Sequence, residues 1–448
     1  MNKRYTYLVL IFLFVAGCLF VVLRYTNGLK SKMNAFYPLQ ERKGTTILAP
    51  DWVATKNKAS KLIRIVRENP DDIKSTLTLA TIYVKESRIT GNSMYYDAAA
   101  MKYVNDVLAK EPENYEALVL KSLIYLSQHH FAEGLAIAEK AVKSGPGNAF
   151  SYGLLVDGNV EMGNYKAAVE NAEKMVSLRP DLRSYSRISY LREIHGDNSG
   201  AIEAMHSAVK AGLPGDESTS WARIQLARLY ENTGDLKSAE MHYTIALDER
   251  PGYPYAIAGL GHIAMGNGDY KKAIVLYQQA DTSINDYSFK EQLANLYLLT
   301  GDKKKAGELM QSVIEGMTRD AKKGEEDESI GHYVDRELAL AYVMTNNYDK
   351  ALQHALAEYN RRPDNIDVNE TVAWVYYKKG DFSKALPFVN AALRTNCKNP
   401  TLLIHAGLIY AKNNQQDKAK ALLQEALQHN PHIDVQLKAE GTSVLQAL

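Results

Sequence analysis

Few residues of this 448-residue chain combine a reactive type with a spacing that catalysis requires. The sequence contains no His-Glu-x-x-His zinc motif, no Gly-rich phosphate loop ending in Lys-Ser or Lys-Thr, and no Gly-x-Ser-x-Gly nucleophile turn. His129 and His130 could bind a metal, but an exposed pair at a turn between helices is the simpler interpretation. Gly259 and Gly261 have the spacing of a nucleotide-binding turn, which close helix packing also explains. We therefore predict no catalytic residues, no metal and no cofactor.

Composition and charge point to a folded protein with an uneven charge distribution. Hydrophobic residues make up 46% of the chain and charged residues 23%, and two cysteines cannot form a disulfide framework. Residues 1–43 carry seven basic residues against one acidic residue, a net charge of +6, whereas the remainder carries 46 against 51, a net −5. A mildly acidic body is not suited to binding phosphate backbones. We therefore predict no nucleic-acid partner.

The N-terminus contains one apolar stretch of nearly membrane-spanning length. Residues 7–23 form a run of 17 residues, which is about 25 Å long as a helix and at the short limit for crossing a bilayer. Basic residues precede and follow this run, and tyrosines lie at its ends. The sequence predicts a single uncleaved anchor over residues 1–25 and a linker over residues 26–50.

Lipidation at Cys18 is the alternative to this anchor. Val15-Ala16-Gly17-Cys18 resembles the cleavage box of a bacterial lipoprotein, in which the cysteine becomes the lipidated N-terminus. The apolar run continues past Cys18, where a lipoprotein typically turns polar, so the anchor is favoured. We expect a bacterial inner-membrane protein with its short N-terminal tail in the cytoplasm and its body in the periplasm.

A motif of about 34 residues recurs along the body of the chain. From Gly163 to Gly301, a Gly-Asp or Gly-Asn pair returns at intervals of 33, 38, 34 and 33 residues. In one copy, residues 221–230 predict a first amphipathic helix, and Gly234 ends it because this position favours positive φ. Residues 238–247 predict a second helix, which a proline then stops. Each copy is therefore predicted to be two helices joined by a tight turn.

This pattern resembles the tetratricopeptide repeat family. Small residues such as Gly407 in the first helix and Ala385 in the second hold the family's close-packing positions, and Tyr410 holds its aromatic position. The resemblance implies an all-α, right-handed α-solenoid of helix-turn-helix repeats, here with an N-terminal transmembrane helix. About ten repeats are expected over residues 73–432, a divergent one followed by nine units that begin near residues 115, 149, 182, 220, 254, 287, 332, 366 and 400.

The ends of the repeat array and one break within it are also predicted. Residues 51–72 predict a capping helix before the first repeat, and residues 433–448 predict a C-terminal cap. A charged run within residues 318–331 interrupts the pattern. It predicts a solvated, mobile connection that could act as a hinge, and a docking loop is the less favoured alternative.

The resemblance also implies where a ligand would bind. In such solenoids the first helices line the concave face, which usually holds the partner. Aromatic and arginine side chains there are good anchors for a peptide, although each could instead pack against the next helix. The family's second and ninth positions, which face this groove, are occupied by Phe150, Arg183, Tyr190, Trp221, Arg228, Tyr255, His262, Asn295, Tyr333 and Trp374.

These observations predict a non-enzymatic scaffold. We expect a membrane-anchored protein, held through residues 7–23, that binds a peptide or protein partner in its concave groove. Its expected role is the assembly or maintenance of a bacterial envelope complex. The alternatives are a lipoprotein with the same scaffold role and an enzyme with a cryptic site in the groove, which would need converging carboxylates or histidines.

Overall fold

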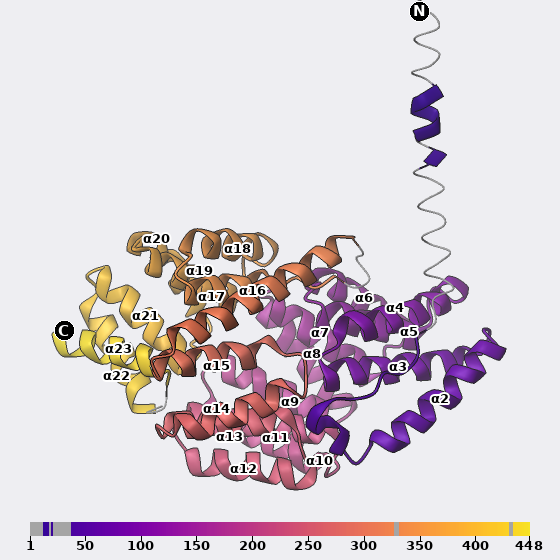
Figure 1. Cartoon of the computed structure of the whole chain (residues 1–448), viewed down its shortest axis with the longest axis horizontal. Helices are drawn as coiled ribbons and strands as arrows, with labels where there is room; N and C mark the ends of the chain where they lie inside the picture. The colour runs from indigo at the N-terminus through magenta and orange to yellow at the C-terminus, as the bar shows by residue number, and fades with distance from the viewer. Residues whose placement is uncertain (1–11, 18, 21–36, 327–330, 430–432) are drawn as a thin grey trace, which may run out of the picture.

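The computed structural model describes residues 12–17, 19–20, 37–326, 331–429 and 433–448. Within these ranges all regular secondary structure is helical, and no strand is present. The helices follow one another along a curved path from the indigo N-terminal end to the yellow C-terminal end (Figure 1). The predicted all-α helical repeat is therefore confirmed.

One helical pair shows how the sequence produces the repeat. Gly234 lies between α11 (Glu217–Asn232) and α12 (Leu236–Glu249) and has a φ of 83°, which glycine adopts without steric cost. The side chain of Asp235 then caps α12 by accepting a hydrogen bond from a backbone N–H of its first turn. Ala239 is completely buried where the two helices meet, because only a small side chain lets the helices approach closely.

The described residues form ten such pairs, in which each first helix packs against the second helix that follows it. Each second helix also packs against the next first helix, which builds a continuous stack. The pairs are α3 (Ile73–Thr90) with α4 (Ser93–Lys110), α5 (Tyr115–Ser127) with α6 (Phe131–Ser144), α7 (Ala149–Glu161) with α8 (Tyr165–Leu178), α9 (Leu182–Ile194) with α10 (Asn198–Ala211), α11 with α12, α13 (Pro254–Gly266) with α14 (Tyr270–Asp281), α15 (Tyr287–Leu299) with α16 (Lys303–Glu326), α17 (Asp335–Met344) with α18 (Tyr348–Arg361), α19 (Ile366–Lys379) with α20 (Phe382–Ala392), and α21 (Pro400–Lys412) with α22 (Gln416–His429).

Further elements flank this stack. The 3-10 helix η1 (Gly44–Leu48) and helix α2 (Trp52–Glu68) precede it, and α23 (Val435–Ala447) follows it. Helix α2 packs on α3, and α23 packs on both α21 and α22. The division of these elements into caps, repeats and a hinge stays a prediction, and residues 327–330 of the expected hinge lie outside the described residues.

Only part of the predicted anchor lies within the described residues. Residues 12–17 and 19–20 are helical, and the side chains of Phe12, Phe14 and Phe20 are all largely exposed. Cys18, the alternative lipidation site, lies outside the described residues. Among the helices that are described, none combines the length and the apolar character that a bilayer span requires. The anchor therefore remains a prediction from the sequence.

Part of the predicted linker is packed against the body. Residues 37–51, which we call the strap, run across α3 and α4 and reach the turns that follow α12 and α14. The guanidinium of Arg42 is buried and donates two hydrogen bonds to the carboxylate of Glu86, at 2.6 and 2.9 Å. The hydroxyl of Thr45 donates to the carbonyl of Gly252 at 2.6 Å. The strap therefore joins the first repeat to repeats near the middle of the chain.

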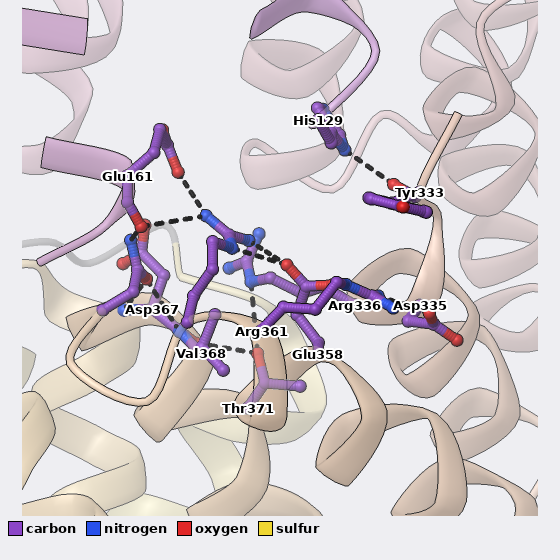
Figure 2. Close-up of polar contacts among 12 residues, drawn as sticks. His129, Glu161, Tyr333, Asp335, Arg336, Glu358, Arg361, Asp367, Val368 and Thr371 are labelled. Atoms are coloured by element: carbon purple, nitrogen blue, oxygen red, sulfur yellow. Dashed lines mark hydrogen bonds and ion pairs between the residues drawn. The ribbon is translucent and has the colours of Figure 1, made fainter. Parts of the chain in front are cut away.

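A second long-range contact, which we call the seam, brings the α5–α6 turn against residues 331–334 and the α7–α8 turn against the segment that joins α18 to α19. The carboxylate of Glu161 forms an ion pair with Arg362. The backbone carbonyl of Glu161 accepts a hydrogen bond from the side chain of Asn365 at 3.1 Å. The backbone N–H of Ile366 donates to the hydroxyl of Tyr165 at 2.9 Å. Figure 2 shows Glu161 facing the residues of this later segment. The solenoid thus curves enough for repeats about 200 residues apart to touch.

The same seam corrects the expectation for His129 and His130. These residues do not form an exposed turn, because His130 is only 6% exposed. His129 Nδ1 lies 2.9 Å from the carbonyl of Tyr333, and His130 Nε2 lies 3.1 Å from the carbonyl of Gly331 (Figure 2 shows the first contact). Sequence reasoning placed the pair at a turn correctly but could not show which distant residues cover that turn.

Candidate functional site

First helices of successive repeats contact one another and so share one face of the stack, which we call the inner face. Burial, together with the carboxylates of Asp367 and Glu161, raises the pKa of Tyr190 well above its usual range. These three side chains belong to α19, α7 and α9, so helices far apart in sequence face one another. Tyr190 remains 39% exposed, which shows that the inner face contains solvent-accessible surface.

Three of the ten predicted groove residues meet in one pocket on this inner face. Trp221 and Arg228 lie on α11, and Tyr255 lies in the first turn of α13. They line a cavity of about 220 Å³. Positions 221, 225 and 228 follow the spacing of one helix face, so α11 presents all three side chains together. We call this cavity the inner pocket; the residues that line it are Arg88, Glu217, Trp221, Ile224, Gln225, Arg228 and Tyr255.

The base of the inner pocket is rigidly held. Glu217 is only 6% exposed; its carboxylate pairs with Arg88 at 3.2 Å and accepts a hydrogen bond from the hydroxyl of Tyr253 at 3.4 Å. The ring of Tyr255 packs edge-on against the rings of Tyr253 and Phe289, at 5.7 and 5.8 Å between centroids. Burial and the neighbouring carboxylate of Asp286 raise the pKa of Tyr255 far above neutral pH. Tyr255 therefore keeps its hydroxyl proton and offers a fixed aromatic wall.

Arg228 is the charged group of the inner pocket that lacks a hydrogen-bonding partner among the described residues. Its side chain is exposed and makes no hydrogen bond or ion pair with any of them. The two nearby carboxylates already have other partners. Glu231 lies 3.3 Å from His262, and Glu193 accepts a hydrogen bond from Asn232 at 3.4 Å. Burial opposes protonation of His262, but its hydrogen bond with Glu231 raises its pKa overall.

The other predicted groove residues lie outside the inner pocket. The guanidinium of Arg183 stacks 4.5 Å from the centroid of Phe150, so these two contact each other. Asn295 donates a hydrogen bond to Asp434 at 2.9 Å, which joins α15 to the residue that caps α23.

Tyr333 and Trp374 are held by neighbouring rings and cations. Tyr333 stacks on His130 at 4.1 Å in the seam, and it borders a separate cavity of about 620 Å³. Trp374 is only 9% exposed, and its rings stack on His405 at 3.6 Å and on Tyr377 at 5.1 Å. Trp374 therefore has little surface left for a partner and packs between α19 and α21.

Sequence reasoning missed four residues of the inner pocket, Arg88, Glu217, Ile224 and Gln225, of which the first two form an ion pair. Arg88 lies at the end of α3 in the divergent first repeat, and it reaches Glu217 across 129 residues of sequence. Glu217 lies before the predicted start of its unit and was not on the expected face. No local signal could identify this pair, because the curvature of the whole stack brings the two helices together.

Comparisons with known proteins support the repeat. Family models of the tetratricopeptide repeat match residues 96–149, 224–288 and 400–432. The second of these segments contains Arg228 and Tyr255, and Trp221 lies just before it. No curated protein sequence matches the chain significantly. The chain is therefore similar to tetratricopeptide repeat proteins over these segments, and proteins with this repeat commonly bind protein partners.

Solved structures of repeat proteins share only the helical architecture. A human IFIT1 dimer bound to PPP-AAAA is 15% identical over 78% of this chain and 89% of its own, with a TM-score of 0.43. Pseudomonas aeruginosa PilF is 14% identical over 46% of this chain and 93% of its own, with a TM-score of 0.37. A tetratricopeptide repeat protein of Parabacteroides merdae is 16% identical over 59% and 98%, with a TM-score of 0.33. At these values the likeness says nothing about a partner or a site.

Proposed function

We propose that this protein is a non-enzymatic scaffold that binds a segment of a protein partner in the inner pocket. The observation that supports this is the meeting of Trp221, Arg228 and Tyr255 in one cavity. Tryptophan, tyrosine and arginine dominate the energy of protein interfaces, because they bury large areas or supply several directed hydrogen bonds. The residues that line the pocket include no serine, cysteine or histidine that could act as a nucleophile or a proton shuttle.

The proposal includes attachment to a bacterial inner membrane through residues 7–23, with the repeat domain in the periplasm. The exposed apolar side chains of Phe12, Phe14 and Phe20 support it, since they have no packing partner among the described residues. Such a location suits a role in assembling or maintaining an envelope complex. Lipidation of Cys18 is the alternative, and Cys18→Ser would release the protein from membranes only in that case.

Partner capture in native membranes tests the pocket. The full chain is crosslinked, purified and compared with the double variant Trp221→Ala/Tyr255→Ala. Both side chains are partly exposed, so capture should fall strongly. Because the Tyr255 ring also packs against Tyr253 and Phe289, thermal unfolding is measured on the same samples, and capture is compared at a temperature where both proteins are fully folded. Met241→Ala/Val275→Ala is the matched control, because these side chains are 49% and 62% exposed on second helices, away from the inner pocket.

Two results would count against the proposal. Equal capture by the wild type and the Trp221→Ala/Tyr255→Ala variant would show that the partner does not bind in the inner pocket. Substrate turnover that is lost on changing a residue of the inner pocket would show an enzyme rather than a scaffold.

A further inference from the structure

We infer that the inner pocket selects a partner segment in which an Asp or Glu side chain stands beside an apolar one. Arg228 would hold the carboxylate, and the apolar side chain would lie between the rings of Trp221 and Tyr255. The inference rests on the proposed function, because it names the chemistry of a partner for the same pocket.

The inference rests on the guanidinium of Arg228, which makes no hydrogen bond with a described residue. Glu217, the only acidic lining residue, is already paired with Arg88 and hydrogen-bonded by Tyr253. The charge of Arg228 therefore gives the lining of the pocket a net charge of one positive unit. None of the N–H groups of its guanidinium donates to a described residue. A guanidinium presents a planar fork of N–H donors that matches a carboxylate in two parallel hydrogen bonds. An anionic acceptor is therefore the group that this pocket lacks.

Cations also crowd the adjoining part of the inner face. Burial lowers the pKa of Arg183 on α9, and the guanidinium groups of Arg187, Arg179 and Arg88 lower it further, against the opposing effect of Asp181. Arg187, Arg179 and Arg88 are already paired with Asp157, Asp181 and Glu217, so Arg228 is the group with which an incoming carboxylate would pair. Glu217 is paired with Arg88 and Glu231 lies 3.3 Å from His262, whereas Glu193 accepts a hydrogen bond only from the neutral amide of Asn232, so a lysine peptide is the necessary competitor in the test.

The size and walls of the pocket favour a peptide side chain over a free metabolite. A volume of about 220 Å³ is below the range of roughly 300–1,000 Å³ typical of small-molecule sites. The pocket is walled by the partly exposed rings of Trp221 and Tyr255 and by Ile224, which is 2% exposed. Such walls accept one aliphatic side chain, and the exposed guanidinium at the rim accepts the carboxylate of its neighbour in the same segment.

The protein contains its own reporter for this site. Of its three tryptophans, Trp52 and Trp374 are 4% and 9% exposed, whereas Trp221 is partly exposed in the pocket. A ligand that enters the inner pocket should therefore change the fluorescence of Trp221 and leave the other two nearly unaffected. The signal change should disappear in Trp221→Phe.

The test uses the full chain in lipid nanodiscs and three capped peptides of equal length, Gly-Glu-Leu-Glu-Leu-Gly and its Gln and Lys counterparts. We expect the Glu peptide to change Trp221 fluorescence with an affinity at least about tenfold higher than the other two, which is the size of one charge-assisted hydrogen-bond pair. Arg228→Gln should abolish this preference. Arg64→Gln is the control, because Arg64 is exposed on α2 and has no partner among the described residues.

The outcomes separate this inference from the proposed function. If the Gln or Lys peptide binds at Trp221 as well as the Glu peptide, the carboxylate preference is overturned and the peptide-binding pocket stands. If none of the three peptides changes Trp221 fluorescence at a peptide concentration of about 1 mM, any binding is too weak to be specific, and the carboxylate preference is also overturned. Binding of N-acetylglutamate as tight as that of the Glu peptide would overturn the assignment to a protein segment. If, in addition, native partner capture survives Trp221→Ala/Tyr255→Ala, the proposed function fails as well.

Discussion

Removing Arg42 should loosen the strap and destabilise the N-terminal half of the solenoid. Arg42 donates two hydrogen bonds to Glu86, and neither side chain has any exposed surface. Arg42→Ala leaves the carboxylate of Glu86 buried without these donors. Asp51, the other partner of Arg42, keeps Arg250 and Lys85, each at 3.1 Å, so its loss is smaller.

The expected size of the effect follows from this burial. Breaking a buried ion pair by removing one partner costs about 3–5 kcal/mol, because the remaining charge is uncompensated in a low-dielectric site. Replacing both partners, as in Arg42→Met/Glu86→Leu, should recover most of this loss, since no buried charge is left. Lys56→Ala is the control for a salt bridge at the surface. Its partner is Glu41, the two side chains are 44% and 69% exposed, and its loss should cost less than about 1 kcal/mol.

Urea unfolding and hydrogen exchange together measure this effect. A repeat array can unfold in steps, so a single global transition could hide a local loss. Amide exchange in α3 and in the strap should therefore accelerate in Arg42→Ala beyond any change in α21 and α22. A variant whose α3 exchanges as slowly as in Lys56→Ala, and whose first transition lies within about 1 kcal/mol of the wild type, would refute this account of the strap.

Three further outcomes are expected. Gly163→Ala should destabilise the protein by about 1–3 kcal/mol more than Gly301→Ala, because both glycines have positive φ but only a Cβ at Gly163 would collide with the carbonyl of Asp364, as urea midpoints would show. Burial, with His206 and Arg223 nearby, lowers the pKa of His242 to about 4. The contribution of neutral His242 to the free energy of unfolding is therefore fully present above pH 6.5 and should be lost as the pH falls from 6.5 towards 4. A pH series of unfolding that is no flatter in His242→Phe would contradict this. Burial raises the pKa of Cys397 to about 11, so in a Cys18→Ser chain iodoacetamide at pH 8 should react at least about 100-fold faster after unfolding, as mass spectrometry would record.

The local structure of each repeat could be read from the sequence. Gly234 marks a turn because glycine adopts positive φ freely, and Ala239 marks a helix crossing because only a small side chain fits there. These signals depend on residues within a few positions of one another. The same periodicity placed Trp221 and Arg228 on one face of a first helix, and this spacing is the part of the inner pocket that sequence reasoning could reach.

Residue periodicity does not distinguish a groove residue from a core residue. Trp374 holds the same repeat position as Arg228, yet the ring of His405 covers it at 3.6 Å. Whether such a side chain faces solvent or a neighbour depends on what the next first helix carries. That neighbour lies about 30 residues away in sequence and becomes adjacent only when the stack forms.

The sequence by itself determined the helical pairs, their order and the residues that share one face of a helix, because each depends on short-range spacing. Tertiary structure alone decided that Arg88 meets Glu217, that Arg42 is buried against Glu86, and that the turn holding His130 is covered by the seam. The physical reason is that the curvature of a solenoid accumulates from a small rotation at every repeat. No single repeat encodes the sum of these rotations, and that sum brings the first repeat against the fifth and so completes the inner pocket.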